Sequence, residues 1–222
     1  MRDLTWQTEQ TQNRVINNSC SGPDGSHDAH LRPGWLHILS RVVAPIRYPA
    51  HAFQMIASDI GQMASSGRIT ITAALQSADE MRRIQRIAHR IRQLQQIYPE
   101  FANSSKTLCE TDPIWQPMRE AVEKLLVAFD WAESFLGLNL VLKPMIDDLF
   151  LKHVSDLALR EDDYLLGQIF FSLNEDCQWH RQWSESLIQT VIEDNSENRK
   201  QFCVGFTAGI HMLLAQFTRL RN

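Results

Sequence analysis

The chain has 222 residues, of which 44% are hydrophobic and 22% charged, and its formal net charge is −4. These values suit a globular protein with a sizeable core, and the acidic balance argues against nucleic acid as the main partner. The four cysteines are scattered without a Cys-x-x-Cys pair, which excludes a disulfide framework and a cysteine-rich zinc site. The polar first residues lack the apolar run of a signal peptide, so we expect a cytoplasmic protein.

Residues 1–33 form a polar segment that is rich in Gln, Asn, Thr and Ser and is broken at 21–25, where Gly and Pro occur together. The segment has no helical or strand period, so it predicts a flexible N-terminal arm. Two interpretations of the arm stay open: it becomes ordered by lying on a partner subunit, or it is a simple disordered tail.

A helical region follows at 35–64, with Pro45 and Pro49 inside it. Proline removes a backbone donor and restricts the residue before it, so the regular helix should begin near Pro49. The apolar stripe of this helix consists of Phe53, Ile56, Ala57, Ile60 and either Met63 or Ala64, and the helix should end at 65–67.

The helix predicted at 69–98 has the clearest 3.6-residue period in the chain. We expect its apolar stripe to face the core, and this stripe consists of Ala74, Ala78, Met81, Ile84, Ala88, Ile91 and either Leu94 or Gln95. The arginines of the helix predict a solvated face, with a protein interface as the alternative. They are Arg82, Arg83, Arg86, Arg90 and Arg92.

A polar connection is expected at 100–111, and Asp112 followed by Pro113 then predicts the start of a helix, with Asp112 as the N-cap. The apolar period continues to Leu142, so one long helix is predicted there. Pro144 should bend it before it continues at 145–159.

The helix predicted at 162–193 has a broad buried face that carries Cys177 and His180. Side chains at i and i+3 share a helix face, so both should point into the interior. In di-iron carboxylate bundles, Glu-x-x-His pairs with this spacing ligate iron. Here a cysteine stands in place of the glutamate.

The last helix is predicted at 201–218, a stretch without formal charge that reaches the lower length limit for crossing a bilayer. Its Gln, His and Gly residues favour a buried or interface helix over a transmembrane one. Long helices without a strand pattern predict an all-α bundle. We place a flexible arm at 1–33, the helical domain at 34–195 and the C-terminal apolar helix within 196–222.

Four segments together resemble one known family. They are DEMRRIQ at 79–85, DPIWQP at 112–117, LVLKPMIDD at 140–148 and the stretch 163–183, which contains CQWH. In this order they resemble the beta subunit of the hydroxylase component of bacterial multicomponent monooxygenases, in the toluene, benzene and alkene branch of the methane/phenol/alkene hydroxylases. The resemblance covers about 40–195, and the segments 1–33 and 196–222 diverge from it.

The resemblance implies a ferritin-like (ribonucleotide reductase-like) helical bundle that lacks the di-iron ligands. In that family the beta chain is a non-catalytic structural subunit docked to a di-iron alpha chain, which oxidises aromatic hydrocarbons or alkenes with O₂ and NADH. A gamma chain completes a dimer of three-chain protomers, and an effector protein, a ferredoxin and a reductase act on the complex. For this chain the resemblance implies no cofactor, no catalytic residue, and neither nucleic acid nor membrane as a partner.

The resemblance also places two degenerate pairs of metal-ligand positions. Glu80 is followed by Arg83 where alpha chains have histidine, and His180 is preceded by Cys177 where they have glutamate. A guanidinium has no lone pair for a metal, and a thiol with one imidazole is a poor substitute for several oxygen ligands. Glu133 lies in the helix expected to supply a further ligand, but it has no partner ligands.

These positions have other interpretations that stay open. Glu80, Cys177 and His180 would hold a metal ion in a self-sufficient ferritin-like metalloprotein. Otherwise His180 is a hydrogen-bonded core residue and Cys177 an apolar filler. Glu80 and Arg83 form either a general acid pair or an ion pair inside the bundle that replaces the lost metal. A stand-alone helical binding protein is the remaining alternative.

Asp147 and Asp148 are adjacent and point in different directions on a helix, so we expect a solvated or interface position for them. Aromatic and guanidinium side chains are common anchors of protein interfaces. The candidate interface residues are Trp115, Trp131, Trp179, Trp183, Arg82 and Arg86.

Overall fold

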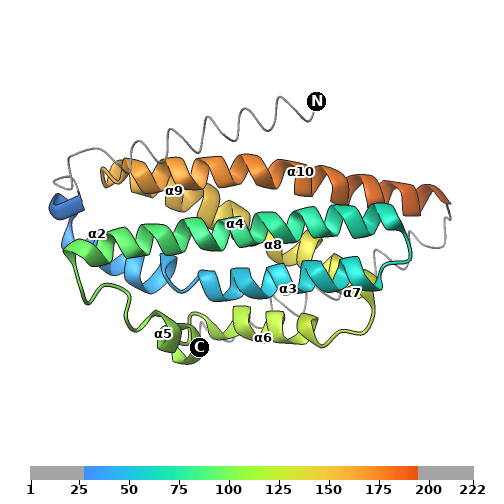
Figure 1. The fold of residues 1–222 in the computed structure, drawn as a ribbon, viewed down its shortest axis with the longest axis horizontal. Coiled ribbons are helices and arrows are strands. Elements are labelled where there is room, and N and C mark those ends of the chain that lie inside the picture. The colour runs from blue at the N-terminus through green and yellow to red at the C-terminus, as the bar shows by residue number, and fades with distance from the viewer. Residues whose placement is uncertain (1–27, 195–222) are drawn as a thin grey trace.

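The computed structural model of the chain describes residues 28–194, and every element in this range is a helix, with no strand (Figure 1). The elements are η1 (Asp28–His30), α2 (Pro33–Ile38), η2 (Leu39–Val43), α3 (Arg47–Met63), α4 (Gly67–Ile97), α5 (Ser105–Thr111), α6 (Gln116–Leu126), α7 (Trp131–Phe135), η3 (Leu136–Leu142), α8 (Lys143–Ile146), η4 (Asp147–Val154), α9 (Ser155–Arg160) and α10 (Tyr164–Asp194). η1 is a 3₁₀-helix, and η2, η3 and η4 are π-helical.

The all-α class predicted from the sequence is confirmed for these residues. The predicted arm as far as residue 27 and the predicted C-terminal helix within 196–222 lie outside the described residues. Among the described helices none is both long and apolar enough to cross a bilayer.

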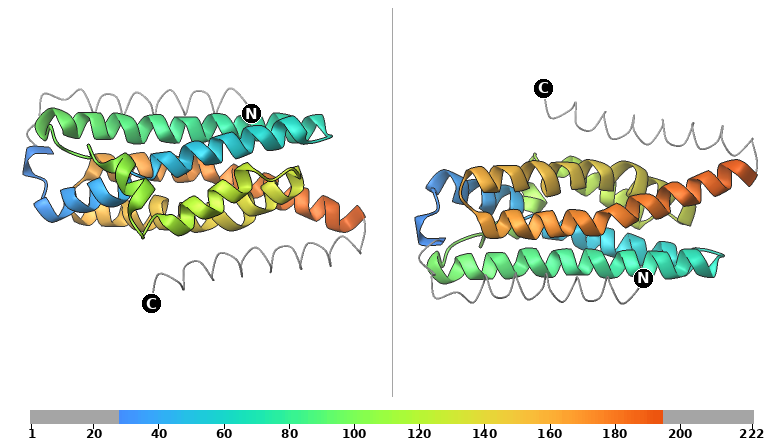
Figure 2. Two further views of the ribbon diagram at one scale, coloured as in Figure 1. Left: turned by 90° about the horizontal axis from the view of Figure 1, so that it is seen from below. Right: turned by 90° about the horizontal axis from the view of Figure 1, so that it is seen from above.

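The long helices α3, α4 and α10 form the body of the bundle (Figures 1 and 2). α3 and α4 are joined by the short turn at 64–66 and pack against each other as an antiparallel pair. α10 packs on α4 and also on η3, η4 and α9, while α6 and α7 pack on α3. The core therefore lies between the α3–α4 pair and the helices that follow.

The apolar stripe predicted for α3 is confirmed from Phe53 to Ile60, whereas Met63 at its end is 39% exposed and Ala64 is half-buried. Phe53, Ile56, Ala57 and Ile60 are each no more than 1% exposed. They belong to one continuous core, which also includes Trp35, Leu138, Leu166 and Phe170 from the surrounding helices. Burial of this apolar surface supplies the main driving force for folding.

The inward face of α4 differs from the prediction. Of the predicted stripe only Ile91 and Leu94, at its C-terminal end, are buried, while Ala74, Ala78 and Met81 are exposed. The buried positions are instead Ala73, Gln76, Ser77, Glu80, Arg83, Ile87, Arg90, Ile91 and Leu94. Arg92 alone among the five arginines is exposed. The prediction was wrong because polar residues also repeat at helical spacing on α4, and ionic partners from other helices compensate their burial.

Two predictions between 100 and 142 were also wrong. The predicted polar connection contains α5, and the long helix predicted from Asp112 is broken at 127–130. Asp130 is the N-cap of α7, where its carboxylate accepts the backbone N–H of Ala132 at 2.9 Å. A local side-chain cap of this kind starts a new helix, and an apolar period does not reveal it.

From Trp131 to Arg160 the chain stays helical through alternating α and π segments. Pro144 lies in the first turn of α8, where the missing N–H of proline is tolerated. π-helical segments lie on both sides of it, where the sequence predicted a bend. Hydrogen bonds in a π-helix span one residue more than in an α-helix, so these segments change which side chains face the core.

Arg90 joins three separate parts of the bundle. Its guanidinium binds both carboxylate oxygens of Asp28, at 2.7 and 2.9 Å, and Asp163 Oδ1 at 2.8 Å. The other oxygen of Asp163 accepts the indole N–H of Trp35 at 3.1 Å. Asp163 also accepts the backbone N–H of Leu166 in the first turn of α10 at 3.2 Å. This Arg90 cluster therefore links η1, α2, α4 and the start of α10.

Candidate functional site

Buried charges gather where α4, α8, η4 and α10 meet. We call Glu80, Arg83, Lys143, Asp147 and Cys177 the charge cluster. All five side chains are at most 4% exposed. The charge cluster contains two carboxylates and two cations, so its formal charges balance. The prediction of a solvated or interface position was therefore wrong for Asp147, and only Asp148 lies at the surface, with a side chain that is 51% exposed.

Each cation of the charge cluster lies close to both carboxylates. Arg83 donates from Nη2 to Asp147 Oδ1 at 2.8 Å, and its Nη1 is 3.4 Å from Glu80 Oε2. Lys143 donates a short hydrogen bond to Glu80 Oε1, and its Nζ is 3.4 Å from Asp147 Oδ2. Cys177 Sγ is 2.8 Å from Arg83 Nη2 and 3.9 Å from Lys143 Nζ.

Helical spacing explains why these side chains meet. Glu80 and Arg83 are three residues apart on α4, and Lys143 and Asp147 are four residues apart across α8 and η4, so each pair shares one helix face. Cys177 comes from the buried face of α10. Each pair contributes one positive and one negative side chain, and the two pairs neutralise each other across the interface between their helices.

The surroundings fix the protonation of the charge cluster. Burial opposes the ionisation of Asp147, but Lys143 and Arg83 outweigh it and hold the pKa of this carboxyl well below its usual range. Burial and the neighbouring Arg83 act to lower the pKa of Lys143, yet the negative groups around it raise that pKa above its usual value. Burial raises the pKa of the Cys177 thiol to about 11, so the thiol is protonated at neutral pH.

His180 belongs to a different network from its predicted partner Cys177. Its Nε2 is 3.0 Å from Asp79 Oδ2, and the same oxygen accepts the indole N–H of Trp179 at 2.9 Å. Arg82 binds the other oxygen of Asp79 at 2.7 Å. Burial lowers the pKa of His180 more than the hydrogen bond to Asp79 raises it, so the imidazole is neutral at pH 7. The interpretation of His180 as a buried, hydrogen-bonded core residue fits this geometry.

A row of polar side chains along the inner face of α4 was missed by the sequence analysis. Gln76 donates to Asn139 Oδ1 at 2.6 Å and accepts the indole N–H of Trp183 at 3.1 Å. The buried polar residues at 76, 80, 83 and 90 have helical spacing, and Ile87 occupies the one intervening position of the same row. That spacing is the sequence signal that could have revealed the polar inner face.

The residues of the charge cluster do not fit an iron pair. A di-iron centre of the carboxylate type needs a set of carboxylate and imidazole ligands around one space. Here a guanidinium and an ammonium, which have no lone pair to offer, bind the carboxylates, and His180 Nε2 is engaged by Asp79. Glu133 is exposed on α7. Between residues 28 and 194 no group of three or more His, Cys, Asp or Glu side chains is arranged to hold a metal ion.

The predicted interface residues lie in different environments. Trp115 is buried within the chain, donates to the carbonyl of Arg41 at 3.2 Å and packs near Phe150, and its role at an interface stays a prediction. The others are half-buried: Trp131, Trp179, Trp183, Arg82 and Arg86. The roles of these five at an interface stay predictions, as do the four degenerate metal-ligand positions.

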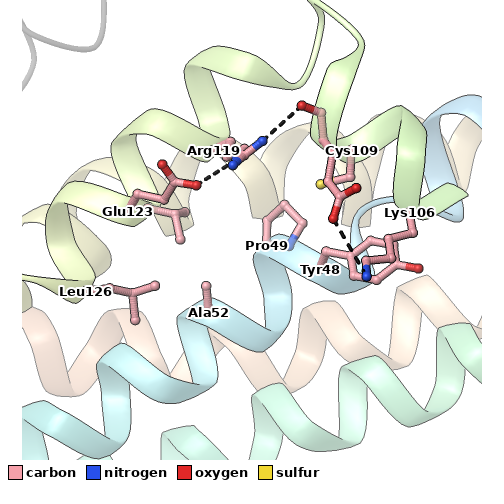
Figure 3. A pocket seen from close by; sticks show the side chains of 10 residues that line it. Tyr48, Pro49, Ala52, Lys106, Cys109, Arg119, Glu123 and Leu126 are labelled. Atoms are coloured by element: carbon pink, nitrogen blue, oxygen red, sulfur yellow. Dashed lines mark hydrogen bonds and ion pairs between the residues drawn. The ribbon is translucent and has the colours of Figure 1, made fainter.

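A separate pocket with a volume of about 300 Å³ opens between α3, α5 and α6 (Figure 3). Its charged residues bind one another: Arg119 donates to Glu123 at 2.6 Å, and Lys106 lies 3.8 Å from Glu110. Burial raises the pKa of Cys109, which also lines the pocket, so this thiol is not activated as a nucleophile. The remaining wall consists of Tyr48, Pro49, Ala52, Val122 and Leu126. No catalytic pairing is present in it.

Comparison with known proteins gives relatives of one kind. The chain is 37% identical over 170 residues to the hydroxylase component subunit beta of the toluene-4-monooxygenase system of Ectopseudomonas mendocina, a match that covers 76% of this chain and 52% of the relative. It is 27% identical to the hydroxylase component small subunit of propane 2-monooxygenase from Gordonia sp. (strain TY-5), covering 76% and 47%. The chain thus spans about half the length of these curated relatives.

The fold is similar to that of a solved structure, toluene 4-monooxygenase with toluene bound in the resting active site. The TM-score is 0.82 at 31% sequence identity, over 100% of this chain and 73% of that chain. This likeness confirms the predicted ferritin-like helical bundle. The sequence model of the Methane/Phenol/Alkene Hydroxylase family matches residues 6–195, a range that begins closer to the N-terminus than the resemblance first seen from about residue 40. The chain belongs to the Methane/Phenol/Alkene Hydroxylase family.

Proposed function

We propose that this chain is a non-catalytic structural subunit, of the beta type, in the hydroxylase component of a multicomponent monooxygenase. It docks a di-iron alpha chain that oxidises an aromatic hydrocarbon or an alkene with O₂ and NADH. The charge cluster carries this proposal, because Arg83 and Lys143 bind the carboxylates Glu80 and Asp147 that a metal would need. The relatives support it, since they are beta or small subunits of hydroxylase components.

In this assembly the present chain needs no cofactor of its own, and the di-iron centre belongs to the alpha chain. Alpha, beta and gamma chains form a dimer of three-chain protomers in the cytoplasm. An effector protein and a ferredoxin with its reductase act on the complex. The helical bundle contributes rigid surfaces: a balanced buried charge cluster holds α4, α8 and α10 in place at a position where a metal centre would otherwise link the helices.

Co-expression tests this function. The chain is produced with an affinity tag, alone and together with a hydroxylase alpha chain that contains two Glu-x-x-His motifs, and the iron content of each purified sample is measured. We expect the alpha chain to co-purify in stoichiometric amount and iron to be present only in the complex. Stoichiometric iron in the isolated chain would instead identify a self-sufficient metalloprotein. If the chain is a monomer and the alpha chain does not co-purify with it, it is a stand-alone binding protein.

A further inference from the structure

The outer face of α4 is apolar although it is exposed in this chain. We call Ile71, Ala74, Leu75, Ala78 and Met81 the α4 outer stripe. Their spacing of three or four residues places them along one side of the helix. All five are exposed, Ile71 by 61% and Leu75 by 54%. Most of the other large apolar residues of α4 lie on its buried side, so this stripe is a second apolar face.

The chain cannot bury the α4 outer stripe by rotating the helix. The opposite face carries Gln76, Glu80, Arg83 and Arg90, each at most 4% exposed and each bound to another helix. A half-turn of α4 would leave Lys143, Asp147 and Asp163 buried without their partners on α4, which is strongly unfavourable. The buried charges therefore fix the orientation of α4, with its apolar stripe facing outward. Burial of the stripe needs a partner from beyond the bundle described here.

The exposed charges of α4 indicate the chemistry of that partner. Arg68 and Arg92 are exposed on either side of the stripe, whereas the carboxylates of the helix, Asp79 and Glu80, are half-buried or buried. Arg68 lies in the first turn, where no acidic residue offsets the positive end of the helix dipole. A complementary surface has apolar side chains at its centre and carboxylates opposite the two arginines.

We infer that the α4 outer stripe docks a helix of the di-iron alpha chain, and this inference rests on the proposed function. From Ile71 to Met81 the stripe is about 15 Å long, which corresponds to almost three turns of a partner helix. Ala74 and Ala78 are small, so the partner backbone approaches α4 closely at the centre of the contact. Arg68 and Arg92 are about 36 Å apart along α4, so the partner helix extends beyond the stripe at both ends, and its carboxylates bind these two arginines there.

Leu75→Glu tests this contact, with Leu149→Glu as the matched control. Leu149 is the same residue type on η4 and is 49% exposed, close to Leu75. A carboxylate placed at the centre of an apolar contact loses its water without gaining a partner, so we expect the Kd for the alpha chain to rise at least about 100-fold. Leu149→Glu should change the Kd less than about threefold. Arg68→Glu should also weaken binding and reduce its salt dependence.

The outcomes separate this inference from the function on which it rests. If the unaltered chain binds the alpha chain and Leu75→Glu binds equally well, the inference is wrong and the function stands. If the unaltered chain does not bind, both are wrong. A lower melting temperature of isolated Leu75→Glu with unchanged binding would show that the chain covers its own stripe. Loss of self-association with unchanged binding would show that a second copy covers it. Both results would overturn the assignment to the alpha chain.

Discussion

Lys143 illustrates how burial decides what an ion pair contributes. The pairs Lys143–Asp147 and Asp148–Lys152 have the same four-residue spacing, but the side chains of the first are at most 3% exposed and those of the second are 51% exposed. Water screens an exposed pair, whereas removing one partner of a buried pair leaves the other charge without compensation. The buried Asp147 should therefore contribute much more to stability than the adjacent, exposed Asp148.

We expect Lys143→Met to lower the free energy of unfolding by about 3–5 kcal/mol, because Glu80 and Asp147 lose their shared ammonium. Lys152→Met is the control, and its denaturation midpoint should match that of the unaltered chain. Urea denaturation followed by circular dichroism measures both variants. A Lys143→Met midpoint equal to that of Lys152→Met would show that the charge cluster does not need the ammonium.

His180 should make stability depend on pH below neutrality. Burial holds the pKa of the folded imidazole below its ordinary value, although the hydrogen bond to Asp79 opposes this. As the pH falls through about 6.5, the unfolded chain therefore binds the proton first. The free energy of unfolding then decreases by up to about 1.4 kcal/mol per pH unit, until the folded imidazole is also protonated. Denaturation between about pH 5 and pH 8 measures this slope.

His180→Gln tests whether His180 causes this pH dependence. In this variant the free energy of unfolding should change less with pH over the same range. If the slope is unchanged, another group is responsible. Asp147 adds a separate decrease at lower pH, because its pKa in the folded chain is also depressed. The stability that its ionised form contributes is present above the ordinary carboxyl pKa near 3.8 and is lost as the pH falls below it.

Among the elements, α7 begins because of a single side chain. Asp130 accepts the N–H of Ala132 as the N-cap of α7. It lies three residues after Val127, the C-cap of α6. Replacing an N-cap aspartate with alanine costs about 1 kcal/mol, so Asp130→Ala should lower the free energy of unfolding by that amount. Asp130→Asn retains the acceptor and should behave like the unaltered chain. Thermal melting of the two variants checks this, and equal melting temperatures would contradict the role of the cap.

The helices also show which parts of the fold a sequence pattern can predict. Their type, the core face of α3 and the approximate bounds of α4 and α10 follow from the apolar period and from the Gly, Pro and Ser residues that end it. The orientation of α4 does not follow, because apolar and polar residues both repeat at helical spacing along it. The choice depends on Lys143, Asp147 and Asp163, which come from distant helices.

The candidate site shows the same limit. The resemblance identified Glu80, Arg83 and Cys177, which do meet in the bundle. It did not identify Lys143 and Asp147, because it compares positions that hold metal in other chains. The sequence predicted a solvated or interface position for Asp147 and no role for Lys143. Only the packed structure shows that their charges complete the charge cluster.

At the scale of the whole molecule, Asp163 holds the ends of several helices together. It binds Arg90 of α4 and Trp35 of α2 and begins α10, and its side chain is 1% exposed. Asp163→Asn removes the charge from a buried pair, so we expect the free energy of unfolding to fall by about 3 kcal/mol. Asp162→Asn is the control, since Asp162 is exposed and asparagine tolerates its positive φ of 62°.

Urea denaturation measures the loss, and hydrogen exchange locates it. In Asp163→Asn the amides of α2 and of the first turns of α10 should exchange faster than in Asp162→Asn. Faster exchange spread evenly over the bundle would show that the Arg90 cluster has no local role.

The π-helical segments on both sides of Pro144 shift the directions of the side chains that follow them. Each π turn takes in an extra residue, so the side chains after η3 point about 100° away from the directions that an uninterrupted α-helix would give them. Lys143 and Asp147 follow η3 and are buried. An alignment that counts straight through 136–142 against an uninterrupted α-helix equates the wrong side chains.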